Sequence, residues 1–399
     1  MELVSSNIYI KELEDKKDVK DFIYLPFELY KGDEAWVPPI LSDFKKYING
    51  INNFLNESGP NIKIVAYKDN EAVGRLLVGI NNYLNDSKGI KEGYISLFEC
   101  INDEAVAFSL LEYAENWLVD KGMEYIKGPL SLPGGDDNRG FLIDNFVDPT
   151  LIMNTYNKKY YNDFFISYGF EKYLDCYAYK SEINNQDIER YEKLVPYAME
   201  KYKFHIDKLD LKNINKEMSD IKYIIDDAMP KEWNDFIPPS DKEIELIAKQ
   251  LVPYADPDLI YIARSDQGIP IGFNISLPDY NQVLKKLNGK LLPFGIVKFV
   301  YLKRKIDKLR FFVLFVVPEY RNKGVTSAIY LQSYRKAIEK GYNFVEGSTI
   351  WEYNTQMKND IEKFGGEVYK TYRIYWKKLD WIYFSLKKSD YKLDFFITI

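Results

Sequence analysis

The residues with the clearest chemical potential lie where an apolar run meets a helical pattern, between positions 314 and 338. Arg321 and Lys323 bring two positive charges to this junction, and Gly324 follows them. A glycine lets the backbone approach a ligand without a side chain in the way. The first amides of a helix have no partner within the helix, so they can hold an anion. A strand, a loop and a helix start of this kind favour binding of a phosphate or diphosphate.

Two phosphate-binding patterns can be set aside from the spacing. The nucleotide-hydrolase loop needs Gly, four residues and then Gly-Lys-Ser/Thr, and the sequence contains no such run. A dinucleotide-binding turn needs Gly-x-Gly-x-x-Gly, and here Gly324 stands alone. What remains is Arg-x-x-Gly-x-Thr, from Arg321 to Thr326, after a strand that ends in Val-Val-Pro-Glu-Tyr. This loop resembles the pyrophosphate loop of the GNAT superfamily of acyl-CoA-dependent N-acyltransferases, whose pattern is Gln/Arg-x-x-Gly-x-Gly/Ala.

The resemblance implies a set of residues that contact acetyl-CoA or another acyl-CoA. The strand end would pair with pantetheine and offer an amide to the thioester carbonyl, as an oxyanion hole does. The loop and the first helical turn would hold the diphosphate, and an Asn would match the family's Asn-x-x-Ala segment. The expected donor-binding residues are Phe315, Val316, Val317, Arg321, Asn322, Lys323, Gly324, Val325, Thr326 and Asn354.

Residues downstream of the loop support the resemblance, with one departure. Asn354 precedes Gly365 by eleven positions, which is the family's interval. Seven residues after Asn354, where many members carry a Tyr that protonates the leaving thiolate, this chain has Ile361. Asn354 also fits an ordinary alternative, the N-cap of the helix that follows it.

The departure leaves the catalytic residues open. Tyr353 or Tyr372 could replace the missing acid. The substrate ammonium must lose a proton before it attacks, and Glu346 is the candidate base. Because Glu346 alternates with apolar residues on its strand, it could face either the cleft or solvent.

The chain repeats itself. The segment 64–75 reads like 260–273, with an apolar strand, a polar turn and a second apolar strand in each. The copies differ in their insertions, because Gly272 precedes Gly341 by 69 positions whereas Gly74 precedes Gly122 by 48. The first-copy counterpart of the phosphate loop is Asn102-Asp103-Glu104-Ala105. Its two carboxylates would repel a pyrophosphate, so we expect the first copy to bind no acyl-CoA.

Composition limits the possible partners and compartments. The 399 residues carry a net charge of −6, which argues against nucleic-acid binding. No apolar run approaches the roughly 20 residues that span a membrane, and the first residues lack a signal-peptide pattern. Two cysteines and one histidine suit neither a disulfide framework nor a His-rich metal centre. We expect a cytoplasmic monomer or homodimer with no metal, no membrane partner and no nucleic acid.

The expected fold class is α/β with a mixed sheet. Two tandem GNAT-like domains would each contain a mostly antiparallel, centrally splayed sheet flanked by helices. We place the first domain, with a degenerate pyrophosphate loop, at 1–182, the second, with the acyl-CoA site, at 183–382, and a C-terminal extension at 383–399. Residues 8–31 are expected to be helical. A bacterial branch of two-domain GNAT-like proteins is similar to this chain in three short segments, 36–39, 128–129 and 140–144. This resemblance does not indicate a substrate.

The function implied is transfer of an acyl group, in the first place acetyl, from CoA to an amine. The acceptor would be a small molecule or a peptide. One alternative is a non-catalytic sensor or scaffold that binds acyl-CoA, which the missing Tyr favours. The other is an aminoacyl-tRNA-dependent transferase, which the acidic chain and the CoA-type loop disfavour.

Overall fold

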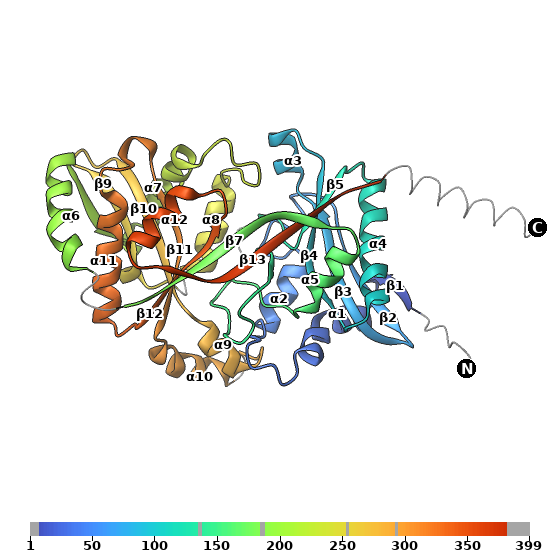
Figure 1. Ribbon diagram of the computed structural model, residues 1–399. Coiled ribbons are helices and arrows are strands. Elements are labelled where there is room, and N and C mark those ends of the chain that lie inside the picture. Colours follow the sequence, from blue (N-terminus) through green and yellow to red (C-terminus); the bar gives the residue numbers. More distant parts are fainter. Residues whose placement is uncertain (1–7, 135–137, 184–187, 253–254, 292–293, 381–399) are drawn as a thin grey trace, which may run out of the picture.

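The protein is described by a computed structural model that covers residues 8–134, 138–183, 188–252, 255–291 and 294–380. Two lobes lie side by side, and a pair of long strands crosses between them (Figure 1). We call residues 8–182 the first half and residues 188–378 the second half. The expected extension at 383–399 lies outside the described residues, as do residues 184–187 beside the expected domain boundary, which remains a prediction.

The two halves share one order of strands and helices, as the repeat in the sequence predicts, apart from β6 in the first half and α6 and α10 in the second. The first half contains β1 (Ile8–Glu12), α1 (Lys16–Leu29), α2 (Leu41–Ile48), β2 (Asn61–Lys68), β3 (Glu71–Ile80), α3 (Asn82–Lys88), β4 (Glu92–Cys100), α4 (Glu104–Asp120), β5 (Tyr125–Gly128), β6 (Phe141–Leu142), α5 (Tyr160–Ser167) and β7 (Glu171–Glu182). The second half contains α6 (Glu189–Tyr202), β8 (Phe204–Lys208), α7 (Ile214–Ala228), α8 (Asp241–Leu251), β9 (Ile260–Ser265), β10 (Pro270–Pro278), α9 (Asn281–Leu287), α10 (Gly295–Leu302), β11 (Lys308–Val316), α11 (Val325–Glu339), β12 (Phe344–Trp351), α12 (Thr355–Lys363) and β13 (Glu367–Lys378).

The beginning of the chain differs from the expected single helix over residues 8–31. Residues 8–12 form β1, which pairs antiparallel with β2, and α1 begins only after Asp15. The Asp15 side chain accepts hydrogen bonds from the amides of Lys17 and Asp18, and Asp18 bonds back to the Asp15 amide, which makes a capping box. The alternating Ile8 and Ile10 follow the period of a strand rather than that of a helix.

One continuous sheet contains strands of both halves, in the order β1-β2-β3-β4-β5-β13-β7-β12-β11-β10-β9-β8, with β6 beside β13. Most neighbours are antiparallel, and the parallel pairs are β4 with β5 and β11 with β12. The structure therefore confirms a mixed α/β fold built from two similar copies.

The two halves exchange their last strands. Strand β7 of the first half pairs with β12 of the second, and β13 of the second half pairs with β5 of the first. Between these contacts β7 and β13 pair with each other over most of their length. The crossing strands in Figure 1 are this pair. Each half therefore depends on the other to complete its sheet.

Each half splays open at its parallel pair. The pairing of β11 with β12 ends at Phe311 and Gly347, although β11 continues to Val316. The pairing of β4 with β5 ends at Tyr94 and Lys127, and β4 continues to Cys100.

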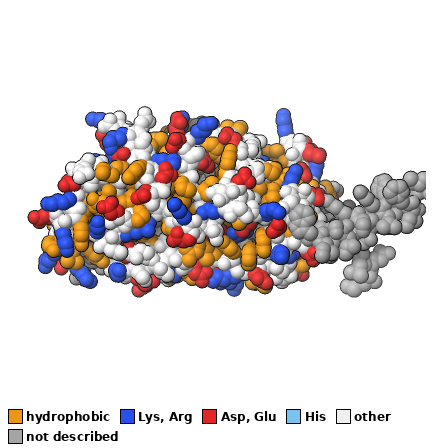
Figure 2. Space-filling view, turned by 90° about the horizontal axis from the view of Figure 1, so that it is seen from above, with side chains coloured by type: hydrophobic (Ala, Val, Ile, Leu, Met, Phe, Trp, Pro, Cys, Tyr) orange, Lys and Arg blue, Asp and Glu red, His pale blue; other side chains and the backbone are white. Residues whose placement is uncertain are grey.

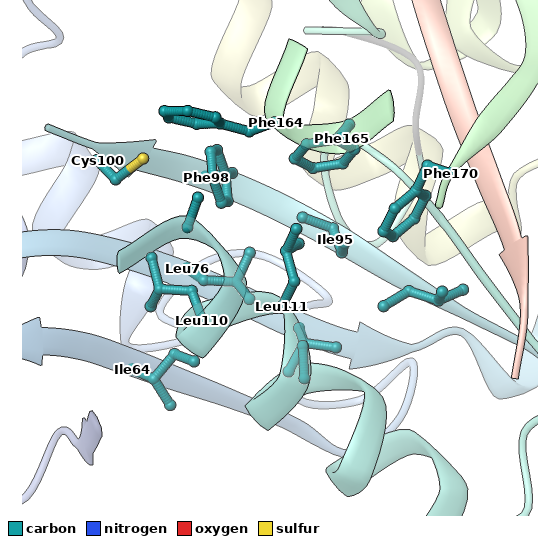
Figure 3. Close-up of a cluster of buried hydrophobic side chains, with 14 of the residues drawn as sticks. Ile64, Leu76, Ile95, Phe98, Cys100, Leu110, Leu111, Phe164, Phe165 and Phe170 are labelled. Atoms are coloured by element: carbon teal, nitrogen blue, oxygen red, sulfur yellow. The ribbon is translucent and has the colours of Figure 1, made fainter. Parts of the chain in front are cut away.

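The core of the first half lies between its sheet and the helices α4 and α5. Figure 3 shows Leu110 and Leu111 of α4 facing Ile64, Leu76 and Ile95 of three strands. Helix α5 adds further aromatic side chains to the same cluster. The helices are thus fixed by apolar packing, which positions the loops at their ends.

The described surface seen from above mixes acidic and basic side chains without a large area of one sign (Figure 2). Among the described residues, no helix has both the length and the apolar character needed to cross a membrane.

We predict that the shared centre of the sheet controls stability. Ile374 of β13 is fully buried against residues of both halves, so Ile374→Ala should lower the free energy of unfolding by roughly 2–5 kcal/mol. Val368→Ala, on an exposed part of the same strand, should cost less than about 0.5 kcal/mol. Urea unfolding followed by circular dichroism measures both. Equal losses in the two variants would contradict the prediction.

Candidate functional site

The start of α11 carries the expected phosphate loop and leaves its first amides without a side-chain cap. Gly324 is the N-cap residue, with a left-handed backbone at φ 86°, and no side chain accepts from the first turn. The matching helix of the first half is closed differently. There Asp103 accepts a hydrogen bond from the Ala105 amide at 3.0 Å and pairs with Lys68 at 2.7 Å. An anion can therefore approach the helix start in the second half, whereas a carboxylate already occupies it in the first.

The structure shows a reason for glycine at position 324 that the sequence did not show. A Cβ atom at this position would lie 2.9 Å from the Cβ of Ala198 in α6, and the positive φ disfavours any other residue. The glycine is thus required by backbone geometry and by packing against α6, before any ligand is considered.

The charged side chains of the loop make contacts with neighbouring carbonyl oxygens and an aromatic ring. The Arg321 guanidinium donates to the carbonyl oxygens of Val316 at 3.2 Å and Ala228 at 2.7 Å. The Lys323 ammonium lies 4.8 Å from the centre of the Tyr320 ring. Both cations thus remain at the start of α11, where they add positive potential to that of the helix amides.

The rest of the expected donor loop is partly accessible. Asn322 is exposed with a left-handed backbone, Thr326 is half-buried, and Val325 is buried beneath the helix start. The structure thus brings Arg321 to Thr326 together at one end of α11.

The strand beside this loop is also partly open. Phe315 is half-buried, whereas Val316 and Val317 are buried, and the Val317 amide donates to the carbonyl of Ile271. In the first half the matching strand end is closed by tyrosines of α5. The Cys100 amide donates to the Tyr161 hydroxyl at 3.0 Å, and the Tyr160 hydroxyl donates to the Cys100 carbonyl at 2.8 Å.

Asn354 and Ile361 have structural contacts. The Asn354 side chain accepts a hydrogen bond from the Met357 amide at 3.2 Å and caps α12, which is the ordinary alternative weighed from the sequence. Ile361 is buried where α12 meets the splayed strands, and a Cβ on Gly347 would lie 2.2 Å from its Cδ1 atom. The missing family Tyr is thus replaced by a packed apolar contact.

Glu346 is fully buried in a polar cluster that joins the halves. Its carboxylate accepts hydrogen bonds from Asn154 Nδ2 at 2.6 Å and from the hydroxyls of Ser348 and Tyr369. Arg310 donates to the Ser348 side chain and to its carbonyl. A base must reach its substrate, and Glu346 has no exposed surface. Glu346 joins the two halves in this structure, and its role as a base stays a prediction.

The two candidate tyrosines differ in accessibility. Tyr372 is fully buried, and its hydroxyl has no hydrogen-bond partner among the described residues, so its catalytic role stays a prediction. Tyr353 is 38% exposed, and its ring stacks on Trp351 and lies beside Trp233, with ring centres 5.7 Å apart in each pair. Burial raises the pKa of Tyr353 above its ordinary value, so its hydroxyl stays protonated.

A cavity of about 610 Å³ opens at the splayed strands of the first half, a size typical of small-molecule sites. Glu99 is one of its charged residues. Its carboxylate accepts from the hydroxyls of Tyr30 at 2.7 Å and Tyr161 at 2.8 Å and lies 3.9 Å from the Arg75 guanidinium. Burial raises the pKa of Glu99 above its ordinary value. Most of the other lining is apolar, and it comes from both halves, including Trp36, Phe44, Leu97, Leu277, Leu284 and Phe299.

The sequence interpretation missed this cavity. Asn154 and Thr155 also line it, and Asn154 Oδ1 and Thr155 Oγ1 are buried without hydrogen-bond partners among the described residues. The sequence held one signal, because the repeat places Glu99 opposite Phe315. Glu99 pairs with Arg75, which follows Gly74. Phe315 pairs with Phe273, which follows the matching Gly272. Among the described residues, no cluster of His, Cys, Asp or Glu could hold a metal ion.

Comparison with known proteins supports the fold assignment. Protein YghO of Escherichia coli strain K12 is 27% identical over 389 residues, which are 94% of this chain and 97% of that protein. The bacterial ceramide synthase of Caulobacter vibrioides is 27% identical over 369 residues, which are 91% of this chain and 95% of that protein. No protein-family model matches the chain.

Solved structures give the same result. A tandem GNAT protein from the clavulanic acid biosynthesis pathway matches with a TM-score of 0.58 and 9% identity, over 94% of this chain and 99% of that one. The GCN5-related glucosamine N-acetyltransferase region of a fungal enzyme matches with a TM-score of 0.56 and 14% identity, over 94% of this chain but 38% of that longer one. The chain therefore has the tandem GNAT fold.

We predict that Asp279, next to the Glu346 cluster, makes stability depend on pH. Burial, together with the Glu346 carboxylate, raises the pKa of Asp279 to about 7. In the unfolded chain this group ionises near about pH 4. The folded state therefore binds the proton more tightly, and this contribution to stability is lost as the pH rises from about 4 to about 7.

Asp279→Asn has no such proton, so its stability relative to the original protein should rise over the same pH window. Urea unfolding at pH 5 and pH 8 tests this. Asp86→Asn, at an exposed carboxyl, is the control and should show no such change. A constant difference between Asp279→Asn and the original protein would contradict the prediction.

Proposed function

We propose that this protein is an acyl-CoA-dependent N-acyltransferase whose donor site is in the second half. The observation that carries the proposal is the asymmetry of the two copies. The start of α11 has uncapped amides beside Arg321 and Lys323, whereas Asp103 caps α4. The diphosphate of an acyl-CoA needs amide donors and positive potential, and the second half offers both.

The strands beside α11 support the same assignment. Beyond Phe311 and Gly347, β11 and β12 no longer pair, and β11 from Phe312 to Phe315 is half-buried. A pantetheine arm can lie along this edge with the thioester between the two strands. Tyrosines of α5 bind the corresponding main chain in the first half, so a donor has no equivalent edge there.

The reaction is a direct transfer. The neutral amine attacks the thioester carbonyl, the new carbon–nitrogen bond forms, and the carbon–sulfur bond breaks. CoA leaves as a thiolate and takes up a proton, and the amide nitrogen loses one. We propose that Tyr353 supplies the proton to the thiolate, because its hydroxyl is partly exposed near the end of β12.

The relatives support this reaction type. A ceramide is an amide formed on a long-chain amino alcohol, so the name of the Caulobacter relative describes formation of the same bond. We therefore propose a long-chain amine as the acceptor class to test first, with acetyl-CoA and a long-chain acyl-CoA as donors.

The donor site is tested by placing a carboxylate in the first turn of α11. Thr326→Asp should leave the helix intact, since acidic residues are favourable at a helix start, but it should repel the diphosphate. The affinity for acetyl-CoA or a long-chain acyl-CoA, measured by calorimetry, should fall at least about tenfold. Thr355→Asp makes the same change at the start of α12 and should have no effect. Unchanged affinity in Thr326→Asp would reject this donor site.

The proposed acid is tested with Tyr353→Phe. Turnover, followed as thiol release with a panel of amines, should fall roughly tenfold to a hundredfold. The effect is modest for an acid because a thiol has a pKa of about 8–9 and leaves readily as a thiolate. Donor affinity should not change. Tyr83→Phe, at an exposed tyrosine of the first half, is the control, and an equal loss there would refute the assignment.

A further inference from the structure

Helix α10 and the residue before it present an unusual set of exposed apolar side chains. Phe294 is 83% exposed, Val297 72% and Tyr301 60%, and Ile296 and Val300 are also exposed. The helix lies at the lower edge of the second half in Figure 1, beside α9. Water is a poor environment for so many apolar groups on two helical turns, so this face requires a partner.

The opposite side of α10 is also apolar and already has its partner. Phe299 stacks on Tyr280 with ring centres 5.6 Å apart, and it packs near Val283, Leu287 and Ile306. A helix that is apolar on all sides is normally enclosed by other elements, but this one is covered on one side. Packing among the described residues therefore does not account for the exposed face.

Basic residues surround the apolar face. From position 281 to 306 the chain contains no Asp or Glu, although the whole protein carries a net charge of −6. The Lys305 ammonium lies 4.6 Å from the Tyr301 ring, and Glu34 of the first half pairs with Lys285 at 2.7 Å. The basic residues of this segment are Lys285, Lys286, Lys290, Lys298, Lys303, Arg304 and Lys305.

The segment is an addition to the repeated fold. Residues 279–307 separate β10 from β11, whereas residues 81–91 separate the matching strands β3 and β4. Helix α3 corresponds to α9, and the first half has no described helix that corresponds to α10. The fold can therefore be completed without α10, so another selective reason must account for it.

We propose that α10 and the seven basic residues around it, which we call the α10 surface, dock on an anionic lipid bilayer. Apolar and aromatic side chains would enter the interface while lysines and arginines contact anionic headgroups, as in interfacial helices. This partner differs from the expectation of no membrane contact. The proposal goes beyond acyl transfer and does not depend on it.

The α10 surface also explains the position of the large cavity. Phe299 and Leu284, on the inner side of α10 and on α9, line the cavity, while the outer side of α10 is exposed. Docking would place the cavity beside the bilayer, so an apolar molecule would have a short path between lipid and protein. Asn154 Oδ1 and Thr155 Oγ1 would meet a polar end of such a molecule.

The test is sedimentation of the full-length protein with vesicles of phosphatidylcholine alone or with about one third phosphatidylglycerol. Binding should occur to the anionic vesicles and weaken several-fold in about 0.5 M NaCl, because salt screens the basic residues. The double variant Val297→Asp with Tyr301→Asp should bind at least about tenfold more weakly. Leu194→Asp with Tyr197→Asp, at two exposed apolar residues of α6, is the matched control and should bind as the original protein does.

Three outcomes would overturn the proposal. The first is no binding of the original protein to anionic vesicles at low salt. The second is unchanged binding in the Val297 and Tyr301 variant, or an equal loss in the α6 control. The third is a dimer on gel filtration that the same variant dissociates while vesicles remain unbound, since a second copy would then cover this face. Melting curves followed by circular dichroism verify that the variants are folded.

Discussion

The exchange of the last strands is the constraint on which the rest of the structure depends. A strand whose backbone groups are unpaired is a liability in water, and without the two exchanged strands β5 and β12 would each end a sheet in the middle of the molecule. Because β7 and β13 also pair with each other, one hydrogen-bonded sheet runs through both halves. The buried cluster around Glu346 lies beside this centre, where Asn154 of the first half reaches the second.

The copies have diverged in complementary ways around their splayed strands. In the first half the cavity opens beneath Trp36, but the tyrosines of α5 close the strand end. In the second half Phe236 packs edge-on against Trp351 with ring centres 5.1 Å apart, while the start of α11 stays uncapped. Trp36 and Phe236 occupy matching places, each followed after one residue by two prolines. One copy thus contains a large cavity, and the other leaves the first amides of a helix without a side-chain cap.

Local patterns predicted much of the fold. The loop from Arg321 to Thr326, the hairpins and the order of elements follow from residue types and short spacings, which depend on neighbours along the chain. Residues 8–12 were misassigned because two alternating isoleucines are a weak signal beside a strong helical pattern. The exchange could not be predicted, because a strand's period gives its faces and not its partner.

The site was predicted only in part, because a local pattern does not identify which distant residues come together. Alternation along β12 left two possible faces for Glu346, and the segment that covers it comes from nearly 200 positions earlier. The cavity needs residues of α9 and of the first half together, and no short spacing connects them. The sequence could have indicated Glu99, because aligning the two copies places this carboxylate at the position that Phe315 has in the second copy.

The late position of β13 also has a consequence for biosynthesis. Residues 367–378 are translated after all the other described strands of the sheet, and until they leave the ribosome β5 lacks its neighbour. The first half therefore cannot mature as an independent unit while the second is being made, unlike chains whose domains fold in turn. A nascent chain would therefore expose the unpaired edge of β5 until β13 emerges.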